Sequence, residues 1–127
     1  MSEFVFTGEP QLSGTVLKWG GTLNPGTMEM AAEGSIEDSV DIFRMWADDA
    51  AGTQQHSELV MQGNRPLTDS VMPGDSYSAS MDLHFPQDGY YHVLLTLDNV
   101  NNGPCYELHV RVEDGQTECK SLYLKYP

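Results

Sequence analysis

Basic residues are scarce in this chain. Six lysines and arginines stand against nineteen aspartates and glutamates, which gives 127 residues a formal charge of −13 and a pI near 4.3. Nucleic-acid binding needs a basic footprint that neutralises phosphates, and anionic lipid surfaces also attract basic segments. The composition therefore excludes nucleic acid and acidic membrane surfaces as expected partners.

Long apolar runs are lacking too. No stretch approaches the ~20 apolar residues of a membrane span. The first ten residues have neither the basic start nor the apolar stretch of a signal peptide. We expect either a cytosolic protein or a mature exported domain with an added methionine.

Only two cysteines are present, Cys105 and Cys119. In a regular hairpin turning at Asp114-Gly115 they would lie about 20 Å apart at ~3.4 Å per residue, whereas a disulfide needs Cα atoms within about 7 Å. A disulfide would require Cys105 to fold back or the second strand to shift, so the bonded and the free state both stay open. Two cysteines in a small acidic domain favour an extracytoplasmic location, periplasmic or secreted, with the cytoplasm as the alternative.

The signatures of common catalytic sites are absent. The sequence has no Gly-x-Ser-x-Gly, no His-Glu-x-x-His, no Cys-x-x-Cys and no glycine-rich phosphate loop. Its carboxylates do not follow the fixed spacing of a known calcium loop. We therefore expect a protein that is not an enzyme and carries no cofactor.

The informative feature is alternation between apolar and polar residues in three successive runs from Ser76 to Glu113. Strand side chains point to opposite faces at every second residue, so each run predicts a strand with one buried and one solvated face. The predicted inward residues are Tyr77, Met81, Leu83, Tyr91, Val93, Leu95, Leu108, Val110 and Val112. Residues 1–127 are thus predicted to form a single all-β domain, an antiparallel immunoglobulin-like β-sandwich of seven to nine strands.

Turn-forming clusters of Gly, Pro, Asn and Asp separate the expected strands. These strands are Glu3–Thr7, Thr15–Trp19, Thr27–Ala32, Ser39–Ala47, Glu58–Gln62, Tyr77–Phe85, Tyr90–Asp98, Tyr106–Glu113 and Lys120–Tyr126. One segment is ambiguous, because Ser35 could cap a helix that continues to Gly52. The even spacing of Val40, Ile42 and Trp46 favours a strand there.

The stretch from Val71 to Asn102 has a family resemblance. Pro73-Gly74-Asp75-Ser76-Tyr77 opens one strand and Asp88-Gly89-Tyr90-Tyr91 opens another. This resembles the latter half of bacterial and archaeal immunoglobulin-like modules of the CARDB type, which are mostly non-catalytic adhesion, spacer or ligand-binding domains. The resemblance covers about a quarter of the chain, and it implies a sandwich with Trp46 at the core position of the third strand.

Each of the three alternating runs carries a histidine on its polar side: His84, His92 and His109. If the runs pair as neighbours, His84 sits opposite His92, and His109 lies near Leu94 and diagonal to His92. Three imidazoles on one solvated face would suit zinc or copper. In an immunoglobulin-like topology the first run belongs to the other sheet, and His84 would leave the cluster.

Two further residue sets suggest ligands. Met28 and Met30 have a Met-x-Met spacing that could serve Cu(I), but their strand parity predicts core packing. Tyr90, together with Tyr123 or Tyr126, could form a platform for sugar rings, whereas Trp19 and Trp46 are expected in the core.

These patterns favour a non-enzymatic binding or accessory module that acts through loops or a sheet face, with a protein or a carbohydrate as its ligand. The alternatives are a zinc- or copper-binding protein that uses the surface histidines, and a carbohydrate-binding module.

Overall fold

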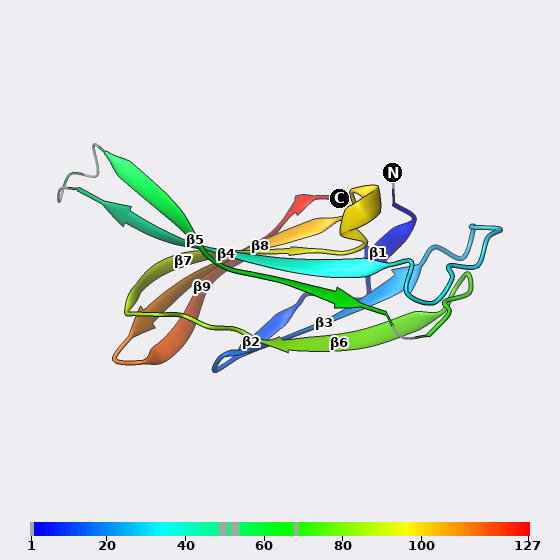
Figure 1. The fold of residues 1–127 in the computed structure, drawn as a ribbon, viewed down its shortest axis with the longest axis horizontal. Helices are drawn as coiled ribbons and strands as arrows, with labels where there is room; N and C mark the ends of the chain where they lie inside the picture. The colour runs from blue at the N-terminus through cyan, green and yellow to red at the C-terminus, as the bar shows by residue number, and fades with distance from the viewer. Residues whose placement is uncertain (1, 49–50, 52–53, 68) are drawn as a thin grey trace.

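Nine strands form two antiparallel sheets that lie face to face in the computed structural model, which describes residues 2–48, 51, 54–67 and 69–127 (Figure 1). The all-β sandwich and its predicted number of strands are confirmed. The strands are β1 Phe4–Phe6, β2 Gln11–Ser13, β3 Val16–Leu23, β4 Glu37–Ala47, β5 Gln55–Pro66, β6 Ser76–Asp82, β7 Gly89–Thr96, β8 Cys105–Glu113 and β9 Gln116–Tyr126. Across these ranges, no helix is long and apolar enough to cross a bilayer.

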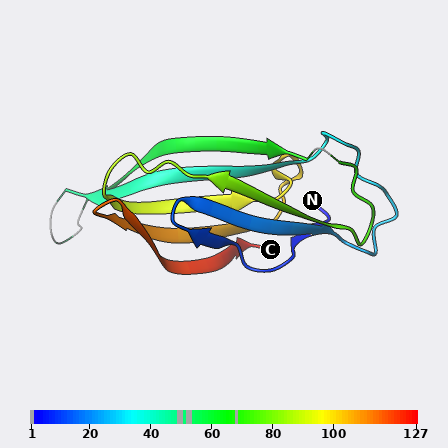
Figure 2. The same cartoon turned by 90° about the horizontal axis from the view of Figure 1, so that it is seen from below.

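The smaller sheet is built around β3. Strands β1 and β2 pair with successive parts of one edge of β3, and β6 pairs along its other edge. The larger sheet has the order β5-β4-β7-β8-β9, and it stacks on the smaller one (Figure 2). Only one face of each sheet is therefore covered, as the alternating sequence requires.

The core lies between the two sheets and follows the predicted alternation. Seven of the nine predicted inward residues are buried, and Tyr77 and Met81 pack against them while partly exposed. Trp19 is buried as expected. The inward face of each strand is thus set by its apolar residues, which fix its register against its neighbours.

Several strand boundaries differ from the prediction. β3 continues through Gly20-Gly21, which was expected to end the strand. Glycine is present at residue 21 for packing, because a Cβ there would lie 2.6 Å from the Tyr77 ring. β2 was not predicted. The expected strand at residues 27–32 is reduced to a single bridge between Ala31 and Val71. The ambiguous segment at residues 35–51 is strand β4 over Glu37–Ala47, as favoured.

Trp46 is not a core residue, contrary to the prediction. β4 pairs with β7 only from Ser39 to Met45, so Trp46 lies beyond the sandwich, where β4 continues beside β5 alone. There the indole stacks on His56, with ring centroids 5.3 Å apart. The Arg44 guanidinium lies over the indole, 4.8 Å from the centroid of that ring. The alternation placed Trp46 on the inward face correctly, but no opposing sheet reaches it.

A polar cluster joins the two sheets inside the core. The Asp38 carboxylate accepts hydrogen bonds from Trp19 Nε1 at 2.8 Å and Tyr77 Oη at 2.6 Å, both from the smaller sheet. Its second oxygen accepts the backbone N–H of Asp98 at 3.0 Å. Asp38 is fully buried, and this burial raises the pKa of its carboxyl although the three donors oppose the shift. The Asp38 side chain on β4 thus accepts hydrogen bonds from three donors, two of them on the smaller sheet.

We expect Asp38→Ala to lower the free energy of unfolding by about 3 kcal/mol or more, because it leaves the donors of Trp19, Tyr77 and Asp98 without their acceptor. Urea unfolding measures this change. Glu37→Ala, on the neighbouring position of the same strand with the opposite orientation, is the matched control and should stay within ~0.5 kcal/mol of wild type. Equal stability of both variants would contradict the role of Asp38.

Candidate metal centre

The outer face of the larger sheet brings two of the predicted histidines together. His92 on β7 and His109 on β8 are direct cross-strand partners, so the register differs by two residues from the predicted position of His109 near Leu94. Their imidazole rings stack with centroids 3.9 Å apart and planes inclined by 8°. Since the inward faces of both strands are fixed by apolar residues, the two histidines are held on the solvated face.

Glu107 joins the two histidines. It lies two residues before His109 on β8 and therefore points to the same face, where its Oε2 is 3.0 Å from His109 Nε2. One ligand atom each from His92, Glu107 and His109 lies within 4.8 Å of the others. The alternation Glu107, His109 was visible in the sequence, but nothing there showed that this carboxylate, among nineteen acidic residues, would face an imidazole pair.

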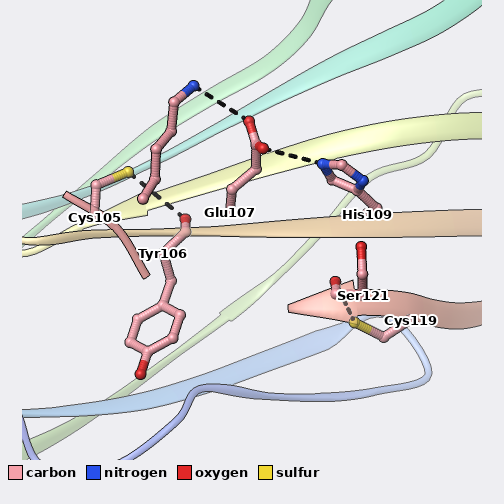
Figure 3. A network of polar contacts seen from close by, with 7 residues as sticks. Cys105, Tyr106, Glu107, His109, Cys119 and Ser121 are labelled. Atoms are coloured by element: carbon pink, nitrogen blue, oxygen red, sulfur yellow. Dashed lines mark hydrogen bonds and ion pairs between the residues drawn. The ribbon is translucent and has the colours of Figure 1, made fainter. Parts of the chain in front are cut away.

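The third neighbour of Glu107 is a cation from the edge strand. Lys125 Nζ on β9 donates to Glu107 Oε1 at 3.4 Å. The carboxylate is therefore held between this ammonium group and His109, whose contact with Glu107 is drawn in Figure 3. Tyr123 meets the His109 ring edge-on, with centroids 5.6 Å apart. Only 6% of Glu107 is exposed, an unusual burial for a charge on an outer sheet face.

The proton equilibria of this group favour metal-binding forms. Desolvation, and then the adjacent His109, lower the pKa of His92 from its ordinary value of 6.5. Burial alone would raise the pKa of Glu107, but the hydrogen bonds with His109 and Lys125 outweigh it and lower that pKa below 4.5. Neutral imidazole and ionised carboxylate are the forms that ligate metal ions, so neutral solution already supplies both.

His84 is not part of the group, so the predicted three-histidine cluster is wrong. His84 is exposed and follows β6, which belongs to the smaller sheet. The chain crosses from one sheet to the other between β6 and β7, and His84 lies in that crossing. The physical cause is the sandwich topology, which separates two strands that are neighbours in sequence.

Both cysteines are free. Cys105 is buried on β8 and Cys119 is exposed on β9, where it pairs with Val110. Cys105 instead pairs with Thr96 and Tyr126, far along the β8–β9 ladder from Cys119 (Figure 3). The two cysteines are thus far apart, as the hairpin geometry considered from the sequence implies, although the β8–β9 ladder has two irregularities. The free thiols remove the disulfide argument for export.

The tyrosines of the predicted sugar-binding platform are exposed, whereas Trp19 is buried in the core. Tyr90, Tyr123 and Tyr126 are all exposed on β7 and β9. The register places Tyr90 beside Arg111 and Tyr123 beside Glu107, so both share the outer face with the histidines.

No family model matches the chain, and no curated protein sequence matches it. The arrangement of His92, Glu107 and His109 is therefore the feature from which a function can be inferred.

The lowered pKa values predict a loss of stability in acid. A histidine whose pKa is lower in the folded state stabilises the fold above its ordinary pKa, and this contribution is lost as the pH falls below 6.5. The contribution of Glu107 is lost only as the pH falls below 4.5. We expect the free energy of unfolding of His92→Gln to change less with pH than that of wild type between about pH 7 and 5.

Urea unfolding at several pH values gives this comparison. Because the net charge of the whole chain also changes with pH, the measured quantity is the difference between variant and wild type at each pH. His84→Gln is the exposed control and should follow the wild-type curve. A His92→Gln curve parallel to that of wild type would contradict the assignment.

Proposed function

We propose that this chain is a non-enzymatic binding module that holds zinc or copper(II) through His92, Glu107 and His109. The proposal is carried by the cross-strand pair His92–His109 together with the buried, ionised carboxylate of Glu107, whose Oε2 lies 3.0 Å from His109 Nε2. Two imidazoles and one carboxylate form a ligand set suited to both ions.

The donor atoms would need only a small rearrangement. Zinc–nitrogen bonds of about 2.0–2.1 Å place the ligand atoms of a tetrahedral site ~3.3 Å apart, compared with separations of up to 4.8 Å here. The stacked rings would rotate about their side-chain bonds so that one nitrogen of each points to the ion. The strands themselves need not move, because all three residues lie on two paired strands.

The surroundings of the site favour binding over catalysis. The three residues lie on an open sheet face. Other residues line the two cavities: Lys18 and Ser78 belong to the one of about 630 Å³, and Met28 and Asp98 to the one of about 680 Å³. An ion with three protein ligands keeps a coordination position for water or for a ligand from a partner. An extracytoplasmic location and kinship with CARDB-type modules stay predictions.

A second candidate is carbohydrate binding by the exposed tyrosines. Tyr90 and Tyr123 flank the histidines on the outer face, and an aromatic ring can cover the apolar face of a sugar. Saccharide binding that persists in the presence of a chelator and in a His92→Ala/His109→Ala variant would favour this function over metal binding.

Isothermal titration with Zn²⁺ and Cu²⁺ tests the proposal. We expect one ion per chain with a dissociation constant near or below micromolar at pH 7.5, and a loss of at least ~tenfold in affinity for His92→Ala and for His109→Ala. Glu107→Gln should weaken binding as well, because it removes the only charged ligand.

His84→Ala and His56→Ala are the matched controls, since they remove the other two histidines. Both should bind the ion like wild type. A wild-type dissociation constant weaker than micromolar, or an equal loss in the His84 variant, would contradict the proposed site.

Lys125 should compete with the metal ion for Glu107. Its ammonium group is 3.4 Å from the carboxylate and would lie close to the bound ion, where like charges repel. We therefore expect Lys125→Gln to bind Zn²⁺ several-fold more tightly than wild type. Lys120→Gln, which removes a lysine paired with Glu118 on the same strand, is the control and should change little. Weaker binding by Lys125→Gln would show that Lys125 supports the site instead.

A further inference from the structure

The methionines of the Met-x-Met segment are exposed, so their predicted core packing is wrong. Met28 is 95% exposed and Met30 is 56% exposed. The segment leaves β3 at Leu23 and turns through Asn24, whose carbonyl accepts the N–H of Thr27, before it reaches these residues. The alternation of side-chain direction that predicted core packing does not apply to Met28 and Met30, because neither residue is in a strand.

A third methionine comes from a distant part of the sequence. Ala31 and Val71 exchange two backbone hydrogen bonds, at 2.8 and 3.0 Å, in an isolated antiparallel bridge. Val71 is buried and Ala31 packs against the core, so the adjacent residues Met30 and Met72 point outward. The antiparallel direction of this bridge places Met30 on one segment opposite Met72 on the other. Met72 is 55% exposed.

Met28, Met30 and Met72 therefore belong to two chain segments that meet at the Ala31–Val71 bridge. Residues 24–36 and 69–75 lie side by side at one end of the sandwich in both Figure 1 and Figure 2, remote from the protruding β4–β5 hairpin. Apolar side chains that are this exposed contribute little hydrophobic free energy to folding. The methionine thioether is also a soft, polarisable group that can bind a ligand. The grouping therefore suggests a ligand that prefers sulfur.

Carboxylates surround the methionines and favour a cation. Glu29 lies between Met28 and Met30, and Asp75 accepts the backbone N–H of Met72 at 3.1 Å. Glu3 accepts a hydrogen bond from the Thr27 hydroxyl on the same loop. These negative charges, in a chain of net charge −13, raise the local concentration of cations.

We propose that Met28, Met30 and Met72 form a second metal site, which takes a soft monovalent ion, Cu(I), through three thioether sulfurs. Thioethers select Cu(I) over Zn²⁺, Mg²⁺ and Ca²⁺, which prefer nitrogen or oxygen. This site is independent of the histidine group, shares no residue with it and binds an ion of a different class.

The test uses NMR of the methionine methyl groups in a Cys119→Ser variant, because the exposed Cys119 thiol would itself bind soft ions. The probes are Ag(I) nitrate in chloride-free buffer and Cu(I) kept reduced by ascorbate. We expect the methyl signals of Met28, Met30 and Met72 to shift together and to saturate at one ion. The partly buried Met45, Met61 and Met81 serve as internal controls and should not shift.

A Met28→Leu/Met30→Leu/Met72→Leu variant keeps the side-chain volume and should lose at least ~tenfold in Cu(I) affinity, measured by competition with a chromogenic chelator. Met45→Leu is the matched control and should bind like the parent. Unchanged affinity in the triple variant would overturn the proposal. So would methyl shifts no larger than those of the control methionines, which would leave the exposed methionines as an apolar surface patch.

Discussion

The antiparallel register between β7 and β8 is the constraint on which the histidine group depends. Tyr91, Val93 and Leu95 on one strand and Leu108, Val110 and Val112 on the other fill the core. A slip of either strand by one residue would turn its three core residues toward solvent, so burial fixes the register. The same register places His92 opposite His109 and puts Glu107 on their face. The geometry of the site is thus held by the core beneath it, and the site residues need contribute little to it.

Much of the fold could be predicted from the sequence because alternation directly encodes a half-buried strand. It identified β6, β7 and β8, their inward residues, and β4 in the ambiguous segment. It failed where tertiary contacts decide. β3 passes through Gly20-Gly21 because the Tyr77 ring occupies the space beside Gly21, and Trp46 is outside the core because no strand of the other sheet faces it.

The histidine site was predicted only in part. Alternation placed all three histidines on outward positions, but it does not assign a strand to a sheet, and His84 belongs to the crossing between the two sheets. Glu107 gave no signal of its own among many carboxylates. Lys125 could not have been predicted, because an irregularity in the β8–β9 ladder sets its position. Met72 lies near Met30 through one isolated bridge, which no local pattern indicates.

The central claim is that one divalent ion binds to His92, Glu107 and His109. A crystal structure of the zinc-loaded protein, with anomalous data collected at the zinc edge, tests it most directly. The account predicts a single strong peak between β7 and β8, bonded to both histidines at about 2.0–2.1 Å and to Glu107 at about 2.0–2.2 Å, with Lys125 displaced from the carboxylate. A peak at His84 or His56, or none on this sheet face, would contradict it.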